Sequence, residues 1–339
     1  MTARPLAITM GDPAGIGPEI VARAFRIAPQ LTGGCFVVGD VACLRRASAW
    51  TADGAPPLPV AAIAAASEVA DVPPACIPVL QVGEPGPLPP VGVVSAQGGR
   101  MAAEAVLWAA RAALRGEVAG VVTAPLHKEA LAAAGLPYPG HTELLQAEAA
   151  AHAGVPLAQM PVRMMLANDE LRTVLVSIHV ALRDAIDAVT RDNVLQTLRI
   201  ADAALQATLG HRPRMAVAGL NPHAGEGGLF GREEIDAIVP AIEVARGEGC
   251  DVHGPFAPDT VFMRARRGEF EVVVAMYHDQ GLIPVKYLGV EKGVNVTLGL
   301  PLVRTSPDHG TAFDIAGTGQ ADAGSLVEAV RAARRLLAY

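Results

Sequence analysis

Short apolar runs that alternate with longer alanine-rich segments are the feature that most constrains how this chain folds. Each run has the length of one buried strand, and each intervening segment is long enough for a helix. Strands that alternate with helices form parallel sheets covered by helices on both faces. We therefore predict an α/β protein with strands at Pro5–Met10, Cys35–Val38, Val118–Thr123, Val162–Ala167, Thr173–Ser177, Met215–Gly219 and Val272–Met276.

The predicted helices lie between these strands. One begins near Pro18, and Ser95 can cap another that ends near Leu114. Three more are predicted at Arg191–Leu209, Glu233–Glu248 and Ser325–Leu337. The segment Gly54–Pro90 is rich in Ala and Pro and predicts no regular element, and its last part, Gly83–Pro90, is expected to be a surface loop.

Length and composition narrow the class of protein. A chain of 339 residues is too long for one ordinary core, so two domains are expected, with a single large barrel as the main alternative. The formal net charge is −7 and no dense Lys/Arg run occurs, which argues against binding to nucleic acid or to an anionic membrane. No stretch approaches the ~20 apolar residues that span a bilayer, and the N-terminus does not resemble a signal peptide. The cysteines form no CxxC pair, so we expect reduced thiols in a cytoplasmic protein.

The first motif, GDPAGIGPE, directly follows the first predicted strand. Its glycines, Gly11, Gly15 and Gly17, allow the backbone to approach a ligand closely, and Pro18 suits the first turn of a helix. The N–H groups at the start of that helix could bind an anion. A tight strand-to-helix turn without a ligand explains the spacing about equally well, and the motif is not the GxGxxG of a Rossmann fold.

Three histidines stand just after apolar runs, two of them in polar, glycine-containing segments. They are His179 in SIHV, His223 in NPHAGEGG and His278 in MYHDQG. Three neutral imidazoles make a good site for a borderline divalent ion and leave positions open for a substrate. No short spacing joins the three, and a single histidine after a strand is more often a hydrogen-bonded structural residue. Both interpretations therefore stay open at this point.

Further polar residues have two interpretations each. Thr142 in GHTE could be the N-cap of a helix, or it could bind a phosphate or carboxylate together with His141. Lys128 could be a solvated helix-start residue, or an acid/base group if burial lowers its pKa. The C-terminal part contains Lys286, Asn295 and Arg304. Its lysine and arginine could bind an anion, or they could only make surface ion pairs.

Six motifs, in this order, resemble the 4-hydroxythreonine-4-phosphate dehydrogenase family nearly end to end: GDPAGIGPE, TAPLHK, GHTE, NPHAGEGG, AMYHDQGLIPVK and NVTLGLPLVRTSPDHGTAFDIAG. The first and last also resemble GDGIGPE and HGSAPDIAG segments of isopropylmalate and isocitrate dehydrogenases. The resemblance implies two layered α/β/α domains with a cleft between them, as in isopropylmalate dehydrogenase. The first domain would hold residues 1–126 and 290–339, and residues 127–289 would form the second, with the metal ligands and a dimer interface.

The resemblance also assigns residues to roles. The metal ligands would be His179, His223 and His278, with His278 supplied to the neighbouring subunit of a homodimer. The substrate would contact His141, Thr142, Lys286, Asn295 and Arg304. We assign the nicotinamide cofactor to the first and last motifs, at Gly11, Asp12, Gly15, Gly17, His309, Gly310 and Asp314. The candidates for proton transfer are Lys128 and Asp259.

The implied reaction oxidises the C3 alcohol of 4-phosphooxy-L-threonine with NAD or NADP and one divalent ion, either zinc, magnesium or cobalt. Its product, 2-amino-3-oxo-4-phosphooxybutanoate, is a β-keto acid that decarboxylates to 3-amino-2-oxopropyl phosphate in pyridoxal phosphate biosynthesis. The alternatives are a related dehydrogenase of D-threonate or D-erythronate 4-phosphate, or of a cis-dihydrodiol; the intact GHTE favours a phosphorylated hydroxy acid. A non-catalytic metabolite-binding protein is the alternative of another class, and the three histidines and Lys286 argue against it.

Overall fold

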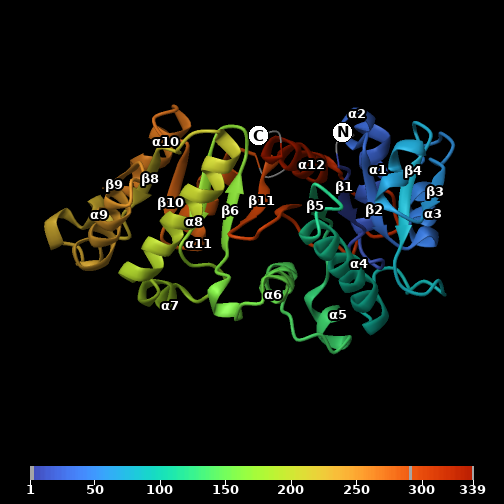
Figure 1. Ribbon diagram of the computed structural model, residues 1–339, viewed down its shortest axis with the longest axis horizontal. Helices are drawn as coiled ribbons and strands as arrows, with labels where there is room; N and C mark the ends of the chain where they lie inside the picture. The colour runs from blue at the N-terminus through green and yellow to red at the C-terminus, as the bar shows by residue number, and fades with distance from the viewer. Residues whose placement is uncertain (1–3, 290–291, 338–339) are drawn as a thin grey trace. The chain divides into compact units, whose positions relative to one another are not determined.

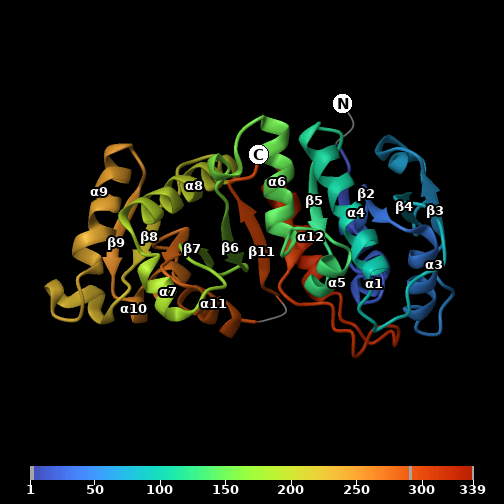
Figure 2. The same ribbon diagram turned by 90° about the horizontal axis from the view of Figure 1, so that it is seen from below.

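The chain folds into two compact units in the computed structural model, which describes residues 4–289 and 292–337. The first unit runs to Pro161 and also takes in Leu300–Leu337, and the second spans Val162–Gly299. Figures 1 and 2 show that each unit contains its own strands and helices. The predicted α/β class is confirmed. No helix within the described ranges combines the length and the apolar character needed to span a bilayer.

The first unit contains a parallel sheet with the strand order β3-β4-β2-β1-β5-β12, of which Figure 1 labels the first five strands. Its strands are β1 (Leu6–Thr9), β2 (Cys35–Gly39), β3 (Val60–Ile63), β4 (Ile77–Gln81), β5 (Gly120–Thr123) and β12 (Val303–Pro307). Leu6 lies opposite Cys35 on one side and Gly120 on the other. Because all these strands run parallel, their carboxyl ends meet at one edge of the sheet.

Helices cover both faces of this sheet. They are α1 (Gly17–Ile27), α2 (Pro29–Thr32), α3 (Val41–Trp50), α4 (Ala96–Leu114), α5 (Lys128–Ala133), α6 (His141–Ala153) and α12 (Gly324–Leu336). Helix α4 packs its alanines against Ala7, Val38 and Val121, and Thr305, on the opposite face of β12, donates to a carbonyl of α12. Ser95 caps α4 through a 3.0 Å hydrogen bond from the Gly98 N–H, as predicted.

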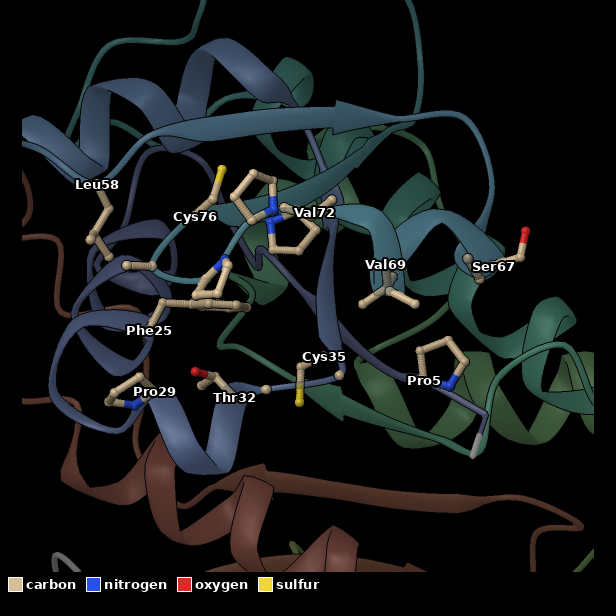
Figure 3. Close-up of a pocket in the computed structure, with 18 of the residues that line it drawn as sticks. Pro5, Phe25, Pro29, Thr32, Cys35, Leu58, Ser67, Val69, Val72 and Cys76 are labelled. Carbon is tan, nitrogen blue, oxygen red and sulfur yellow. The ribbon is translucent and has the colours of Figure 1, made fainter. Parts of the chain in front are cut away.

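A cavity of about 570 Å³ opens at the amino ends of β1, β2 and β4 in the first unit. Figure 3 shows Pro5, Cys35 and Cys76 around it, each at or just before the start of a strand, with Phe25 on the helical side. Both cysteines are free thiols, and burial raises the pKa of Cys35 to about 11. Because ligands of such folds bind beyond the carboxyl ends of the strands, this cavity does not mark the functional site.

The second unit has the strand order β11-β6-β7-β10-β8-β9. Its strands are β6 (Arg163–Ala167), β7 (Arg172–Leu175), β8 (Met215–Ala218), β9 (Val252–Phe256), β10 (Val272–Ala275) and β11 (Val294–Leu298). Here the prediction of wholly parallel sheets is wrong, because β6 runs antiparallel to both β7 and β11. The link from β6 to β7 is a turn in which Asn168 Oδ1 accepts from the Leu171 N–H at 2.8 Å. A turn that short can join only antiparallel strands.

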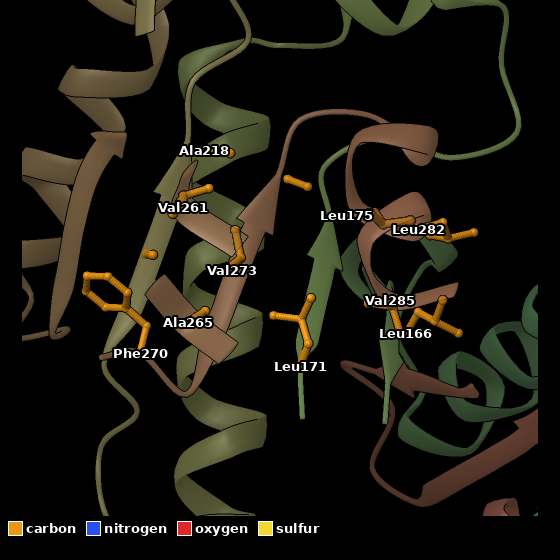
Figure 4. Close-up of a cluster of buried hydrophobic side chains, with 12 residues drawn as sticks. Leu166, Leu171, Leu175, Ala218, Val261, Ala265, Phe270, Val273, Leu282 and Val285 are labelled. Carbon is orange, nitrogen blue, oxygen red and sulfur yellow. The ribbon is translucent and has the colours of Figure 1, made fainter. Parts of the chain in front are cut away.

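The helices of the second unit are α7 (Leu182–Asp187), α8 (Arg191–Leu209), α9 (Val239–Gly247), α10 (Pro258–Arg266) and α11 (His278–Tyr287). Figure 4 shows α10 and α11 closing one face of the sheet over a buried cluster that includes Leu175, Val261, Val273 and Leu282. A 3₁₀ segment, η3 (Pro222–Gly228), follows β8, and one π-helical turn, η4 (Glu234–Ile238), precedes α9.

The observed division of the chain differs from the boundaries expected from the sequence. Residues 127–161 belong to the first unit, because Leu131 of α5 and Leu144 and Leu145 of α6 share a buried cluster with α4. The expected return of the chain at Val290 lies outside the described residues. Within Gly54–Pro90, which predicted no regular element, the structure contains β3 and β4, whereas Gly83–Pro90 is a loop as expected.

Candidate functional site

The three histidines follow neighbouring strands of the second unit. His179 comes after β7, His278 after β10 and His223 after β8, and β10 pairs in parallel with both of the others. The sheet order β7-β10-β8 therefore places all three histidine-bearing segments at one edge. This confirms the prediction that each histidine follows a strand.

Two of these imidazoles lie beside each other. The ring centroids of His179 and His278 are 5.4 Å apart, with the ring planes inclined by 46°. The Nδ1 atom of His278 lies 2.8 Å from Asp279 Oδ1, which leaves its Nε2 for another ligand. The two histidines that lie together in this chain are thus His179 and His278, whereas the resemblance pairs His179 with His223 and takes His278 from the partner.

His223 stands on an unusual turn. Residues His223–Gly227 all have left-handed backbone angles, with φ of 52° at His223, 53° at Ala224 and 44° at Glu226. Non-glycine residues in this conformation are each destabilised by roughly 1–2 kcal/mol. Among the described residues, no group of three His, Cys, Asp or Glu side chains is close enough to hold a metal ion. His223 is therefore not grouped with the other two histidines in this single chain.

A buried carboxylate anchors the turn that carries His223. Glu234, at the start of the π-helical turn η4, is only 3% exposed. Its Oε1 accepts the N–H groups of Leu220 and Asn221 at 2.7 and 2.8 Å, and its Oε2 accepts from the Asn221 side chain at 2.9 Å. Single π turns in helices are frequent at functional sites, where they reposition a side chain. Glu234 was not predicted from the sequence, where a Glu-Glu pair shortly after a glycine-rich segment is the feature that could have indicated its role.

The donor set at this edge fits a divalent ion. Histidine nitrogens suit zinc, cobalt and similar ions, and two of them already lie side by side. On α11, His278 and Lys286 line the same surface pocket of about 270 Å³. Lys286 lies two helical turns after His278, so the pocket has a positively charged side chain in addition to the imidazole. Asn295 is half-buried on β11, and Asp259 is exposed at the start of α10. Their predicted roles in substrate binding and proton transfer stay predictions.

In the first unit, a buried cation lies at the carboxyl edge of the sheet. Arg304 on β12 is 4% exposed, and its Nε and Nη2 donate to Thr123 Oγ1 on β5 at 3.1 and 2.8 Å. Desolvation lowers the pKa of Arg304 to about 10, while the nearby Glu143 acts in the opposite direction. The guanidinium stays charged at neutral pH and is held in one place. Thr123 was missed because a threonine ending a strand carries no distinguishing pattern.

His141 lies close to this arginine. Desolvation, with a further contribution from the charge of Arg304, holds the pKa of His141 well below its usual range, so its imidazole is neutral. One ring nitrogen donates to the carbonyl of Ala124, and the enclosed Nε2 has no hydrogen-bond partner among the described residues. A neutral ring whose Nδ1–H is used offers a lone pair at Nε2.

The structure excludes Thr142 as the N-cap of helix α6. The helix begins at His141, and its N-cap is Gly140 without a side-chain cap, so Thr142 is not the N-cap. Thr142 is the second residue of the helix and remains available for a ligand. Lys128 is exposed at the start of α5, as the interpretation of a solvated helix-start residue expects, and its role in proton transfer stays a prediction.

The first and last motifs lie against each other in the first unit. The Ile16 N–H donates to the Thr311 carbonyl at 2.9 Å, and a Cβ added to Gly15 would come within 2.9 Å of Thr311 Cβ. The buried carboxylate of Glu19 accepts the N–H groups of Gly317 and Gly319. This packing accounts for Gly15 without a ligand, and it assembles the residues predicted to bind the cofactor into one region.

Asp12 is the buried acid of this region. It is 1% exposed, and its Oδ1 accepts from the Ala14 N–H at 2.9 Å. Its Oδ2 has no hydrogen-bond partner within the part of the chain that the structure describes. Burial raises its pKa, against the lowering effects of the Ala14 hydrogen bond and of His127. The His127 ring in turn stacks on the ring of Phe313 in the last motif, with the ring centroids 4.8 Å apart. Beyond these residues, His309, Gly310 and Asp314 are exposed on the segment after β12.

A glycine-rich turn and a group of histidines beyond the carboxyl ends of strands, with a buried guanidinium and a neutral imidazole near one such end, are typical of an α/β enzyme of small-molecule metabolism. The chain belongs to the family described as pyridoxal phosphate biosynthetic protein PdxA, whose model matches residues 32–333. Membership confirms the resemblance carried by the six motifs and the dehydrogenase class that it implied. A dehydrogenase of this family implies a nicotinamide cofactor as the hydride acceptor.

Individual relatives match over almost their whole length. The chain is 53% identical over 336 residues to the 4-hydroxythreonine-4-phosphate dehydrogenase of Beijerinckia indica, covering 99% of this chain and 96% of the relative. It is 46% identical over 339 residues to the D-threonate 4-phosphate dehydrogenase of Salmonella typhimurium, covering 99% and 100%.

Solved structures agree with these matches. The crystal structure of 4-hydroxythreonine-4-phosphate dehydrogenase from Klebsiella pneumoniae has a TM-score of 0.88 at 42% identity, covering 99% of this chain and 100% of that one. A terephthalate 1,2-cis-dihydrodiol dehydrogenase from Burkholderia xenovorans has a TM-score of 0.67 at 32% identity, covering 98% and 97%.

Proposed function

We propose that this protein oxidises 4-phosphooxy-L-threonine with NAD or NADP to 2-amino-3-oxo-4-phosphooxybutanoate, which decarboxylates to 3-amino-2-oxopropyl phosphate. The reaction would serve pyridoxal phosphate biosynthesis in the cytoplasm. The observation that carries the proposal is the buried, fixed guanidinium of Arg304 beside the neutral His141. The 53% identity to a 4-hydroxythreonine-4-phosphate dehydrogenase supports it.

Arg304 would bind the phosphate group of the substrate. Its guanidinium is already oriented by Thr123, so little side-chain entropy is lost when an anion binds. His141 would contribute differently, because its Nε2 lone pair accepts a hydrogen bond and does not donate one. We infer that His141 contacts a hydroxyl or ammonium group of the substrate. Thr142, Lys286 and Asn295 are proposed as further substrate contacts.

The residues His179, His223 and His278 would hold a divalent ion such as zinc, cobalt or magnesium. When bound, such an ion supplies positive charge that favours loss of the proton from the substrate alcohol. Lys128 and Asp259, which are exposed at the starts of α5 and α10, are proposed to transfer protons. The first and last motifs are proposed to bind the nicotinamide cofactor, because they form one region at the carboxyl edge of the sheet.

A homodimer is part of the proposal. Each of the three histidine-bearing segments carries large apolar side chains that are exposed to solvent. They are Val180 and Leu182 after His179, Leu229 and Phe230 after His223, and Ile283 and Tyr287 after His278. Leu229 is 73% exposed and Tyr287 is 89% exposed. Apolar residues gathered around polar groups mark interaction surfaces. A second copy of the chain would cover these side chains and complete the three-histidine site.

The Salmonella typhimurium relative, at 46% identity, keeps D-threonate 4-phosphate as a second candidate substrate. The purified protein, with added zinc, magnesium or cobalt, should be mixed with each candidate and with NAD+ or NADP+. We expect the absorbance of the reduced nicotinamide to rise fastest with 4-phosphooxy-L-threonine. A faster rise with D-threonate or D-erythronate 4-phosphate would reassign the substrate. No rise with any phosphorylated hydroxy acid, but turnover of a cis-dihydrodiol, would contradict the proposal, and no turnover at all would favour a binding protein.

A further inference from the structure

Side chains continue the hydrogen bonding of the second unit's sheet beyond the end of β10. The last paired residue of that strand is Ala275, and the next peptide, at Met276, is completely buried. Its N–H donates to Gln280 Oε1 at 2.7 Å, and its carbonyl accepts from Ser177 Oγ at 2.9 Å. A buried peptide at the end of a strand must find such partners, because water cannot reach it.

Gln280 also reaches the neighbouring strand end. Its Nε2 donates to the carbonyl of Gly219, directly after β8, at 2.7 Å. One amide side chain thus joins the end of β10 to the end of β8, and Ser177 joins the end of β10 to the end of β7. Together Gln280 and Ser177 tie three adjacent strand ends into one hydrogen-bonded row.

Each tied position lies close in sequence to a histidine. Ser177 is two residues before His179, and Gly219 is four residues before His223. Met276 is two residues before His278, and Gln280 is two residues after it. A shift of any one strand end would therefore change the spacing between imidazoles. None of the histidine side chains needs to touch Gln280 for this coupling to act.

We propose that Gln280 is a positioning residue of the histidine site, which with Ser177 fixes the mutual spacing of the segments that carry His179, His223 and His278. The inference rests on the proposed function, in which these histidines hold a divalent ion. Residues outside the ligand set that orient metal ligands typically change metal affinity tenfold to a hundredfold when they are substituted. A residue that only caps the start of α11 would alter stability and leave the metal geometry unchanged.

The test uses the whole protein and Co²⁺, whose visible absorption reports the geometry of its ligands. Gln280→Met keeps the length of the side chain and removes both hydrogen bonds. Gln206→Met makes the same change at an exposed position of α8 and serves as the matched control. We expect Gln280→Met to weaken Co²⁺ binding by about tenfold to a hundredfold and to alter the Co²⁺ spectrum, and Gln206→Met to do neither.

Ser177→Ala tests the same row with a smaller change, and it decides the matter if Gln280→Met does not fold. It should also weaken Co²⁺ binding, while thermal unfolding of the metal-free protein shows that the fold is retained. Wild-type affinity and spectrum in a folded Gln280→Met, or in Ser177→Ala if that variant alone folds, would overturn the inference. His223→Ala and His278→Ala distinguish a failure of this inference from a failure of the proposed metal site. If these two variants bind Co²⁺ like the wild type, the proposed metal site itself is wrong.

Discussion

Arg304 donates two hydrogen bonds to one atom, the hydroxyl oxygen of Thr123 on the neighbouring strand. The contact holds a charged group at the carboxyl edge of the sheet in a buried position, where desolvation lowers its pKa to about 10. A group in this state gains more from a bound anion than an exposed arginine does, because there is less water to screen the interaction. Arg304 is therefore the residue whose loss should be most specific for the charge of the substrate.

We expect Arg304→Ala to lower kcat/KM by roughly tenfold to a hundredfold for the phosphorylated substrate, since a charge-assisted hydrogen bond is worth about 1.5–3 kcal/mol. The effect should nearly vanish for the same compound without its phosphate. Steady-state kinetics on both compounds make the measurement, and Arg45→Ala, at an exposed position of α3, is the control. Equal losses on both compounds would show that Arg304 does not recognise the phosphate.

His223→Ala should lower metal content and activity together, because the loss of one ligand weakens a three-ligand site. Elemental analysis of the purified protein measures the metal. His211→Ala, which changes an exposed histidine in the same unit, should retain both metal and activity. A full complement of metal in His223→Ala would remove His223 from the ligand set.

Mixed dimers test whether the site is shared between subunits. If His278 completes the partner's site, a dimer of one His223→Ala chain and one His278→Ala chain has both lesions in one site and an intact second site. Co-expression of the two inactive variants should then restore up to about half of the wild-type activity. The closeness of His179 and His278 within this chain makes the opposite outcome informative. If mass spectrometry detects mixed dimers that are inactive, the ligands come from one chain.

The neutral His141 should leave a signature in the pH dependence of stability. Its pKa is held well below 6.5 in the folded protein, so the unfolded chain takes up a proton at mildly acidic pH that the folded chain does not. The free energy of unfolding should therefore fall as the pH drops below about 6.5, by at most about 1.4 kcal/mol per pH unit from this group.

The free energy of unfolding can be measured with a denaturant at several pH values. In His141→Gln it should fall less steeply with decreasing pH than in the wild type, because the contribution of His141 is removed. His152→Gln provides the comparison, because His152 is exposed on the same helix and should leave the slope nearly unchanged. If His141→Gln and the wild type lose stability in parallel between neutral and mildly acidic pH, the imidazole is not held neutral by the fold.

Much of the fold could be predicted because the buried strands are short and strongly apolar. The run at Val272–Met276 is an example, and the β10 strand occupies almost the same residues. The β3 strand was missed because two of its four residues are alanines, which favour helices over strands, and because prolines directly precede it. The direction of β6 depends on one tight turn at Asn168, and no periodicity of the flanking strands reveals it.

The candidate site was predictable where residue types are rare and missed where they are common. His179, His223 and His278 stand out because histidine is scarce and each follows an apolar run, and glycines stand beside His223 and His278. Thr123 and Gln280 act through hydrogen bonds to partners that are 181 and 61 residues away in the chain. Only the sheet order brings such partners together, so a linear pattern cannot show them.

The sheet order also determines when this site can form during folding. The strand β10 lies between β7 and β8 but follows both of them in the chain. Until β10 inserts, the segments that carry His179 and His223 have no neighbour in common, and His278 has not yet been placed. A nascent chain that has emerged from the ribosome only as far as η3 thus has His179 and His223 but lacks the strand that lies between β7 and β8. At the proposed metal site, ion binding would then require the insertion of β10, so a chain that ends before β10 could not hold an ion between these histidines.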